Sequence, residues 1–304
     1  MVIYRAAVQS SSLEIGLAGK GTFRWVVADL TLALEEARRR LDMSPLAAVA
    51  LGRALVGAVL LLRLSFKVPA RLILELRGNG PLGLVRAEVD HLGRVRGTVG
   101  NPRVQGAEDD FSVAEALGKG SLFVTRETRG SGAARYTSQV ALVSGELGDD
   151  LTHFLEQSQQ IRSAVLLGVL PVPIGIAAAG GLIVEALPGT EESDLAKLER
   201  NIHSLEGVSS YLSSGGMPRL LAATFAGFDV EVLEKRPLEY SCSCNRGRLL
   251  DLLRQLEPEE IEEMKVQTGN CEAVCSYCGN RYFYDPEELS AGPASGLADA
   301  ANEL

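Results

Sequence analysis

The chain has 304 residues, of which 46% are hydrophobic and 23% charged, so one large core or two to three modest domains can form and wholesale disorder is excluded. The net charge of −9 is unevenly spread, since residues 1–184 carry 20 basic and 17 acidic side chains whereas residues 237–304 carry 5 and 13. Phosphate would repel that acidic segment, which argues against nucleic acid as a main partner.

Helix and strand patterns follow one another irregularly over residues 1–184, which predicts an α+β core domain. Leu46 to Leu62 is strongly apolar, but Arg53 interrupts it and Ser44-Pro45 is typical of a helix start, so we expect a buried helix and no membrane contact. Further helices are expected over 31–41 and 146–159, and strands over 71–75, 85–90, 94–99, 121–126, 136–143, 164–170 and 177–187.

A different pattern begins at Pro188, and residues 185–236 are predicted to form a helical linker. We expect one helix with Thr190 as its N-cap and a second short helix from Met217, joined by Ser209-Ser210 and Gly215-Gly216. Two small helices cannot form a core alone, so their apolar faces must rest on a neighbour, either as an ordinary connector or as a movable cover. These faces carry Leu195, Leu198, Ile202, Leu220, Leu221 and Phe225.

All five cysteines lie between Cys242 and Cys278, which indicates a local site in residues 237–290 rather than a disulfide framework. The pairs Cys242-Ser-Cys244 and Cys275-Ser-Tyr-Cys278 supply four thiolates, and the three histidines are remote, so a closed, structural Zn²⁺ site is predicted. Unpaired buried cysteines are the alternative.

Cys271 is a fifth thiol that could act as a ligand, a resolving thiol or a small apolar strand residue. Helices are expected over 248–256 and 258–264, a strand over 281–284, and a disordered tail over 291–304.

The C-x-C pair has redox consequences, because a disulfide across one intervening residue closes a strained ring that is easily reduced. Zinc keeps the sulfurs as thiolates, the form that peroxide attacks, so a reversible switch and a static zinc ribbon are both open. No catalytic residue is nominated, since the histidines are scattered and Gly78-Asn-Gly80-Pro-Leu-Gly83 is followed by a strand pattern rather than a helix. We therefore predict a turn there and no enzymatic activity.

The cysteine layout, with Tyr282-Phe-Tyr284 behind it, resembles the 33-kDa heat-shock protein family of redox-regulated chaperones. The resemblance covers about residues 1–290. It is also carried by Leu51-Gly-Arg-Ala-Leu-Val-Gly57, Gly78-Asn-Gly-Pro81, Gly97-Thr-Val-Gly-Asn-Pro102, Val143-Ser-Gly-Glu-Leu147 and Ala179-Gly-Gly181. Two positions depart from the family pattern: Cys271 has no counterpart among the four zinc cysteines, and Tyr284 stands where phenylalanine is frequent.

The resemblance implies a cytoplasmic, ATP-independent holdase that binds unfolded client proteins under oxidative stress. Such a chaperone is latent while Cys242, Cys244, Cys275 and Cys278 hold one Zn²⁺, and it is active once they are oxidised and the metal has left. The implied disulfides join Cys242 to Cys244 and Cys275 to Cys278, and the oxidised form is commonly a homodimer. A static zinc ribbon that binds nucleic acid or the translation apparatus is the alternative, and a zinc enzyme is disfavoured because four cysteines leave no open coordination position.

Overall fold

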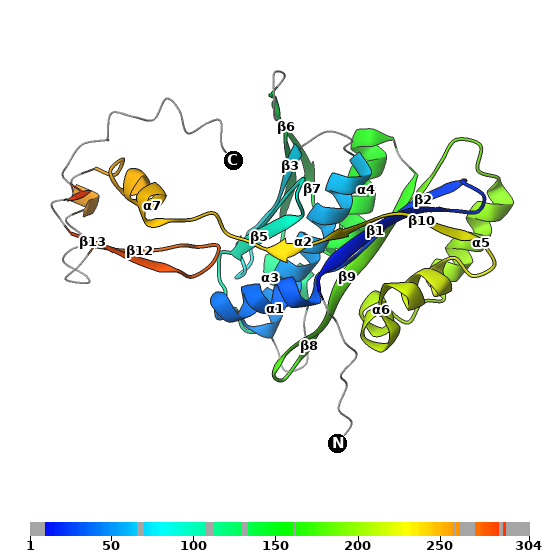
Figure 1. The fold of residues 1–304 in the computed structure, drawn as a ribbon, viewed down its shortest axis with the longest axis horizontal. Helices are drawn as coiled ribbons and strands as arrows, with labels where there is room; N and C mark the ends of the chain where they lie inside the picture. The colour runs from blue at the N-terminus through cyan, green and yellow to red at the C-terminus, as the bar shows by residue number, and fades with distance from the viewer. Residues whose placement is uncertain are drawn as a thin grey trace. The chain divides into compact units, whose positions relative to one another are not determined.

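The fold is taken from a computed structural model (Figure 1), which describes residues 10–65, 70–106, 112–128, 133–160, 162–257, 259–261, 271–285 and 288–289. The chain forms two compact units, residues 1–241 and residues 242–304. Each unit is considered by itself. The predicted tail 291–304 and most of the predicted helix 258–264 lie outside the described residues.

The large unit contains two sheets, in agreement with the predicted α+β class. The first has the order β10-β1-β2-β9-β8, with β1 at Ser12–Ala18, β2 at Phe23–Asp29, β8 at Ser163–Val172, β9 at Gly175–Ala186 and β10 at Val230–Pro237. The second has the order β11-β5-β4-β3-β6-β7, with β3 at Ala70–Gly78, β4 at Leu84–Asp90, β5 at Arg94–Val99, β6 at Gly120–Thr128, β7 at Arg135–Ala141 and β11 at Glu239–Tyr240. Their neighbours pair antiparallel, except that β11 runs parallel to β5.

Helix α2 (Pro45–Ser65) occupies the centre of the large unit and contacts strands of both sheets (Figure 1). Its segment Pro45–Leu64 is long and apolar enough to cross a membrane, but 89% of the most apolar window is buried inside the fold, as predicted for a core helix. The surrounding core contains 48 buried residues among those described. The remaining helices near it are α1 (Thr31–Arg40), α3 (Val113–Leu117) and α4 (Leu147–Gln159).

The segment predicted as a linker contains α5 (Glu192–His203), α6 (Val208–Thr224) and the edge strand β10, all within the large unit. The two helices pack on the five-stranded sheet, where Phe225 and Leu220 meet a cluster that includes Trp25. Of the six apolar residues predicted on these helices, Leu198, Leu220, Leu221 and Phe225 are buried, and Leu195 and Ile202 are partly buried. In this structure, the neighbour that supports these faces is the sheet.

Two predicted details of these helices are wrong. Glu191 rather than Thr190 is the N-cap of α5, because the Thr190 hydroxyl is directed to the carbonyls of Thr22 and Leu187. Ser209-Ser210 is helical and not a joint, because the first segment of α6 begins at Val208. The second segment follows a kink at Gly216 and begins at Met217, as predicted. The joint lies at Gly216, whose φ of 68° is in the left-handed region that glycine tolerates.

The small unit has helix α7 (Arg246–Leu253) and a hairpin of β12 (Cys271–Val274) and β13 (Arg281–Tyr284). The strand was predicted, and α7 begins two residues earlier than expected because the Asn245 side chain accepts the N–H of Arg248 as an N-cap. Among the described residues, only Cys271, Tyr284 and Leu289 form its buried apolar cluster. This unit therefore has a thin core.

Candidate metal centre

The hairpin turn places two of the thiols. The carbonyl of Cys275 accepts the N–H of Cys278 at 3.3 Å and that of Gly279 at 2.8 Å, and the N–H of Cys275 donates to the carbonyl of Asn280 at 2.9 Å. Gly279 has a φ of 71°, which a residue with a side chain adopts only with strain. The tight turn brings both sulfurs to one side of the hairpin.

The other two thiols come from the segment that leads into α7. Cys244 directly precedes the cap Asn245, so the start of the helix fixes its position. Its sulfur lies 3.4 Å from the Tyr282 hydroxyl, which also donates to the Cys244 carbonyl at 3.4 Å. Strand β13 therefore holds the C-x-C segment against the hairpin across a sequence separation of 38 residues.

The four sulfurs have the spacing of a tetrahedral site. The Sγ atoms of Cys242 and Cys275 are 3.7 Å apart, those of Cys244 and Cys278 are 3.3 Å apart, and all four lie within 4.8 Å of one another. Zinc–sulfur bonds of about 2.3 Å in a tetrahedron give sulfur–sulfur edges of about 3.8 Å. The donor set thus fits a metal ion. The four residues are the same four that the sequence predicts as ligands.

The thiols differ in how readily they ionise. Burial is the main cause that raises the pKa of Cys242, and burial also raises the pKa of Cys278. Burial acts on Cys244 in the same direction, but hydrogen bonds from Tyr282 and the neighbouring thiols outweigh it and lower its pKa. Negative charge in the metal-free cluster is therefore favoured at Cys244, and a cation at the centre would favour all four thiolates.

Cys271 does not belong to the group of four. It is fully buried in β12, directly opposite Tyr284 of β13, and both belong to the small apolar cluster. Of the three roles left open by the sequence, this position corresponds to the small apolar strand residue. Cys271 and Tyr284 are thus cross-strand neighbours.

A polar network beside the centre was not predicted. Arg246 donates to the carbonyl of Phe283 at 3.1 Å and to the carboxylate of Glu288 at 2.6 Å, and the Tyr284 hydroxyl donates to the Arg246 carbonyl at 2.8 Å. The hydrogen bond from Arg246 lowers the pKa of Glu288 to about 2. These partners are separated by about 40 residues, so no local pattern could have revealed them.

In the large unit, Gly78 to Gly83 forms the predicted turn between β3 and β4.

Comparisons with known proteins agree with this layout. The family model described as Hsp33 protein matches residues 12–285. The chain is 44% identical over 288 residues to the 33 kDa chaperonin of Thermus thermophilus, covering 90% of this chain and 84% of that one. It is 38% identical over 279 residues to the 33 kDa chaperonin of Limosilactobacillus fermentum, covering 90% and 95%. The crystal structure of the 33 kDa chaperonin from Thermotoga maritima superposes with a TM-score of 0.84 at 34% identity, covering 93% and 97%.

Proposed function

The chain belongs to the Hsp33 family, and from that membership we propose that it is a redox-regulated, ATP-independent holdase that keeps unfolded proteins from aggregating under oxidative stress. Its relatives are named chaperonins, which supports a chaperone and a role without catalysis. The proposed site of action is the cytoplasm, where thiols stay reduced until an oxidant appears. The observation that carries the proposal is the tetrahedral spacing of the four sulfurs.

The metal is proposed to be one Zn²⁺ per chain, held by Cys242, Cys244, Cys275 and Cys278. An all-sulfur donor set suits zinc and leaves no open position for chemistry on a substrate, which supports a structural role. The buried apolar cluster of the small unit has three members among the described residues, so thiolate–metal bonds would supply most of the unit's stability. Structural zinc of this kind is worth on the order of 10 kcal/mol of folding free energy.

Oxidation would remove that contribution. Peroxide oxidises one thiolate of a pair to a sulfenic acid, and the second thiol attacks it, so two thiols and one peroxide give a disulfide and two waters. The proposed disulfides are Cys242–Cys244 and Cys275–Cys278, which together consume two peroxides. Disulfide sulfurs are poor ligands for Zn²⁺, so the four oxidised cysteines would no longer hold the ion and the small unit would unfold.

The client surface is proposed to be the apolar interface between the linker helices and the five-stranded sheet. One residue, Ser241, separates β11 from Cys242, and β11 is a two-residue strand that pairs with β5 through Glu239 and Tyr240. Unfolding of the small unit would therefore loosen the chain next to β11 and β10 first. Release of α5 and α6 would then uncover Leu195, Leu198, Ile202, Leu220, Leu221 and Phe225. Apolar surface of this kind also suits the proposed homodimer of the oxidised form.

The proposal is tested by counting thiols and zinc on the same samples that are assayed for suppression of client aggregation. Reduced protein is expected to contain one zinc per chain and to protect a denaturing client poorly. Peroxide with mild heat should remove four thiols and the zinc and should increase protection. Equal protection by reduced, zinc-loaded protein would refute the switch and favour a static zinc ribbon. Salt-dependent RNA binding by the reduced protein would support that ribbon directly.

A further inference from the structure

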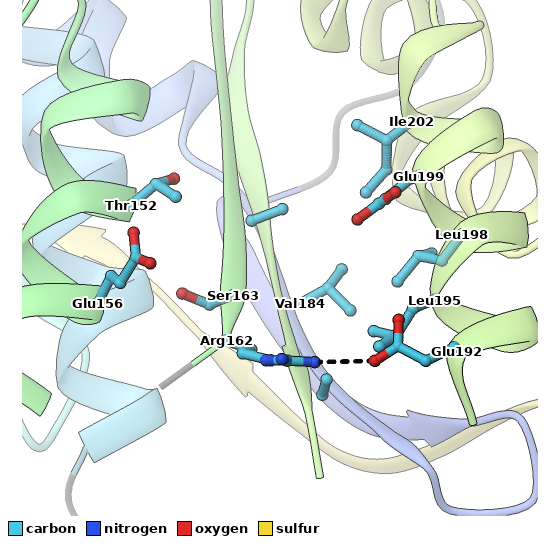
Figure 2. A pocket seen from close by; sticks show the side chains of 12 residues that line it. Thr152, Glu156, Arg162, Ser163, Val184, Glu192, Leu195, Leu198, Glu199 and Ile202 are labelled. Atoms are coloured by element: carbon cyan, nitrogen blue, oxygen red, sulfur yellow. Dashed lines mark hydrogen bonds and ion pairs between the residues drawn. The ribbon is translucent and has the colours of Figure 1, made fainter. Parts of the chain in front are cut away.

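A trough runs along the edge strand β8 of the large unit, between α4 and α5. It consists of two depressions that share Ile202, with volumes of about 420 Å³ and about 270 Å³. The larger depression, seen in Figure 2, is lined by Ala164 and Val184 of the sheet and by Leu195 and Leu198 of α5. The smaller one lies further along β8. Its apolar lining consists of Val165, Leu166, Leu167, Leu205 and Val208.

The two apolar depressions are arranged along one strand. Ser163 and Ala164 of β8 line the first, and the next three residues of β8 line the second. Two apolar seats in a row suit a polymer with repeated apolar side chains better than a single compact molecule. An extended polypeptide, whose side chains recur every few ångströms, has this form.

Carboxylates dominate the rim of the trough. Arg162 pairs with Glu192 at 3.3 Å, and Arg53 pairs with Glu146 at 2.5 Å. Three further carboxylates have no cationic partner in the described part of the chain: Asp149, Glu156 and Glu199. The trough therefore presents an excess of negative charge around an apolar floor, which is complementary to apolar groups flanked by cations.

The trough also contains a polar group without a partner. The Ser163 hydroxyl oxygen is buried and makes no hydrogen bond within the described structure. Figure 2 shows it directed to the side of Thr152 and Glu156.

We propose that this trough binds an extended polypeptide segment with two apolar side chains in the depressions and Lys or Arg at its ends. The ligand class, an unfolded polypeptide, rests on the proposed function. The site itself belongs to the folded large unit and does not require oxidation. It would give the chaperone a weak selectivity for basic, apolar stretches before the linker helices are released.

The test measures fluorescence anisotropy of labelled ten-residue peptides with the full chain, reduced and zinc-loaded, at low salt. One peptide has two leucines and terminal arginines, a second has the same leucines and terminal glutamates, and a third has serines in place of the leucines. The first is expected to bind tightest. Loss of the leucines should weaken binding at least about tenfold, since each buried leucine contributes strongly.

Charge-reversal variants locate the site. Glu156→Lys and Glu199→Lys should each weaken the arginine peptide about three- to tenfold and strengthen the glutamate peptide, because rim charges act through the local potential. Glu231→Lys is the matched control, since Glu231 is an exposed carboxylate on β10, at the opposite edge of the same sheet. It should leave both affinities within about twofold.

The outcomes separate this site from the redox switch. If oxidised protein fails to protect clients while the arginine peptide still binds with the expected charge dependence, the switch is wrong and the trough stands. If oxidised protein protects clients but the arginine peptide does not bind, the trough is not the site. The same holds if Glu231→Lys and Glu199→Lys change the affinity for the arginine peptide by the same factor relative to the unsubstituted chain.

Discussion

The two units of this chain are stabilised in different ways. The large unit has clusters of 48 and 13 buried residues among those described, whereas the small unit has a cluster of three and a group of four thiols. Stability in the large unit is distributed over many apolar contacts, and this unit contains no cysteine. If the four sulfurs hold a metal ion, as proposed, stability in the small unit is concentrated in that one centre. Under the proposed function, a single chemical event would therefore unfold the small unit and leave the core around α2 folded.

Removal of the metal gives the largest expected effect and is the most direct way to break this comparison. A chelator applied to reduced protein should cost the small unit roughly 10 kcal/mol or more, enough to unfold it. Amide hydrogen exchange should then show loss of protection in β12 and β13. The strands around α2, for example β3, serve as the internal control and should keep their protection. A hairpin that stays protected without metal would show that its apolar cluster suffices.

A substitution in the core of the large unit should lower the stability of that unit and leave the metal centre of the small unit unchanged. Trp25 is fully buried between the five-stranded sheet and α6, so Trp25→Ala is expected to lower the unfolding free energy of that unit by about 3–5 kcal/mol. The zinc content should remain one per chain. Trp25→Phe is the matched control and should cost less, because it keeps a ring and discards an indole N–H that has no partner in the described structure. Denaturant unfolding with zinc quantification measures both variants.

The fold was predictable where the pattern of side chains reports burial on one face. Strand β4 alternates apolar and charged residues and was predicted nearly to its ends. Strand β2 was missed because it is buried on both faces, as in Trp25 to Asp29, and so shows no alternation. The sequence pattern predicts the residues of β10 as part of a helical linker, which is wrong, since the place of this strand at the sheet edge depends on pairing with β1, more than 200 residues away in sequence.

The candidate metal site could be predicted as far as metal binding depends on the spacing of the cysteines along the sequence. The two cysteine pairs predicted the four candidate ligands, because four thiols in such spacing suit a tetrahedral ion. The position of Cys271 was not decidable, since it depends on the hairpin register that sets it opposite Tyr284. The contact of Tyr282 with Cys244 was missed for the same reason.

Cys271 allows the comparison to be sharpened within the small unit. If it is a core residue and not a ligand, Cys271→Ser should destabilise the unit by about 1–3 kcal/mol, because a buried hydroxyl lacks a partner there. Cys271→Ala should be milder, since it removes only part of a small side chain. Both variants should still bind one zinc per chain. A zinc stoichiometry below one in Cys271→Ala, measured on folded protein, would assign Cys271 to the metal centre.

Tyr284 tests how much the polar network adds to the metal. Its hydroxyl donates to the Arg246 carbonyl at 2.8 Å, so Tyr284→Phe should lower the stability of the zinc-loaded small unit by only about 0.5–1.5 kcal/mol, the worth of one hydrogen bond.

Tyr282→Phe is the matched variant, because the Tyr282 hydroxyl contacts the Cys244 sulfur instead. It should raise the rate at which peroxide consumes thiols more than it alters stability, since a hydrogen bond to a thiolate that is already ionised reduces its nucleophilicity. Thermal unfolding followed through the hairpin and timed thiol counting separate the two effects. A loss of zinc in Tyr284→Phe at neutral pH would mean that the network, and not the thiolates alone, holds the centre together.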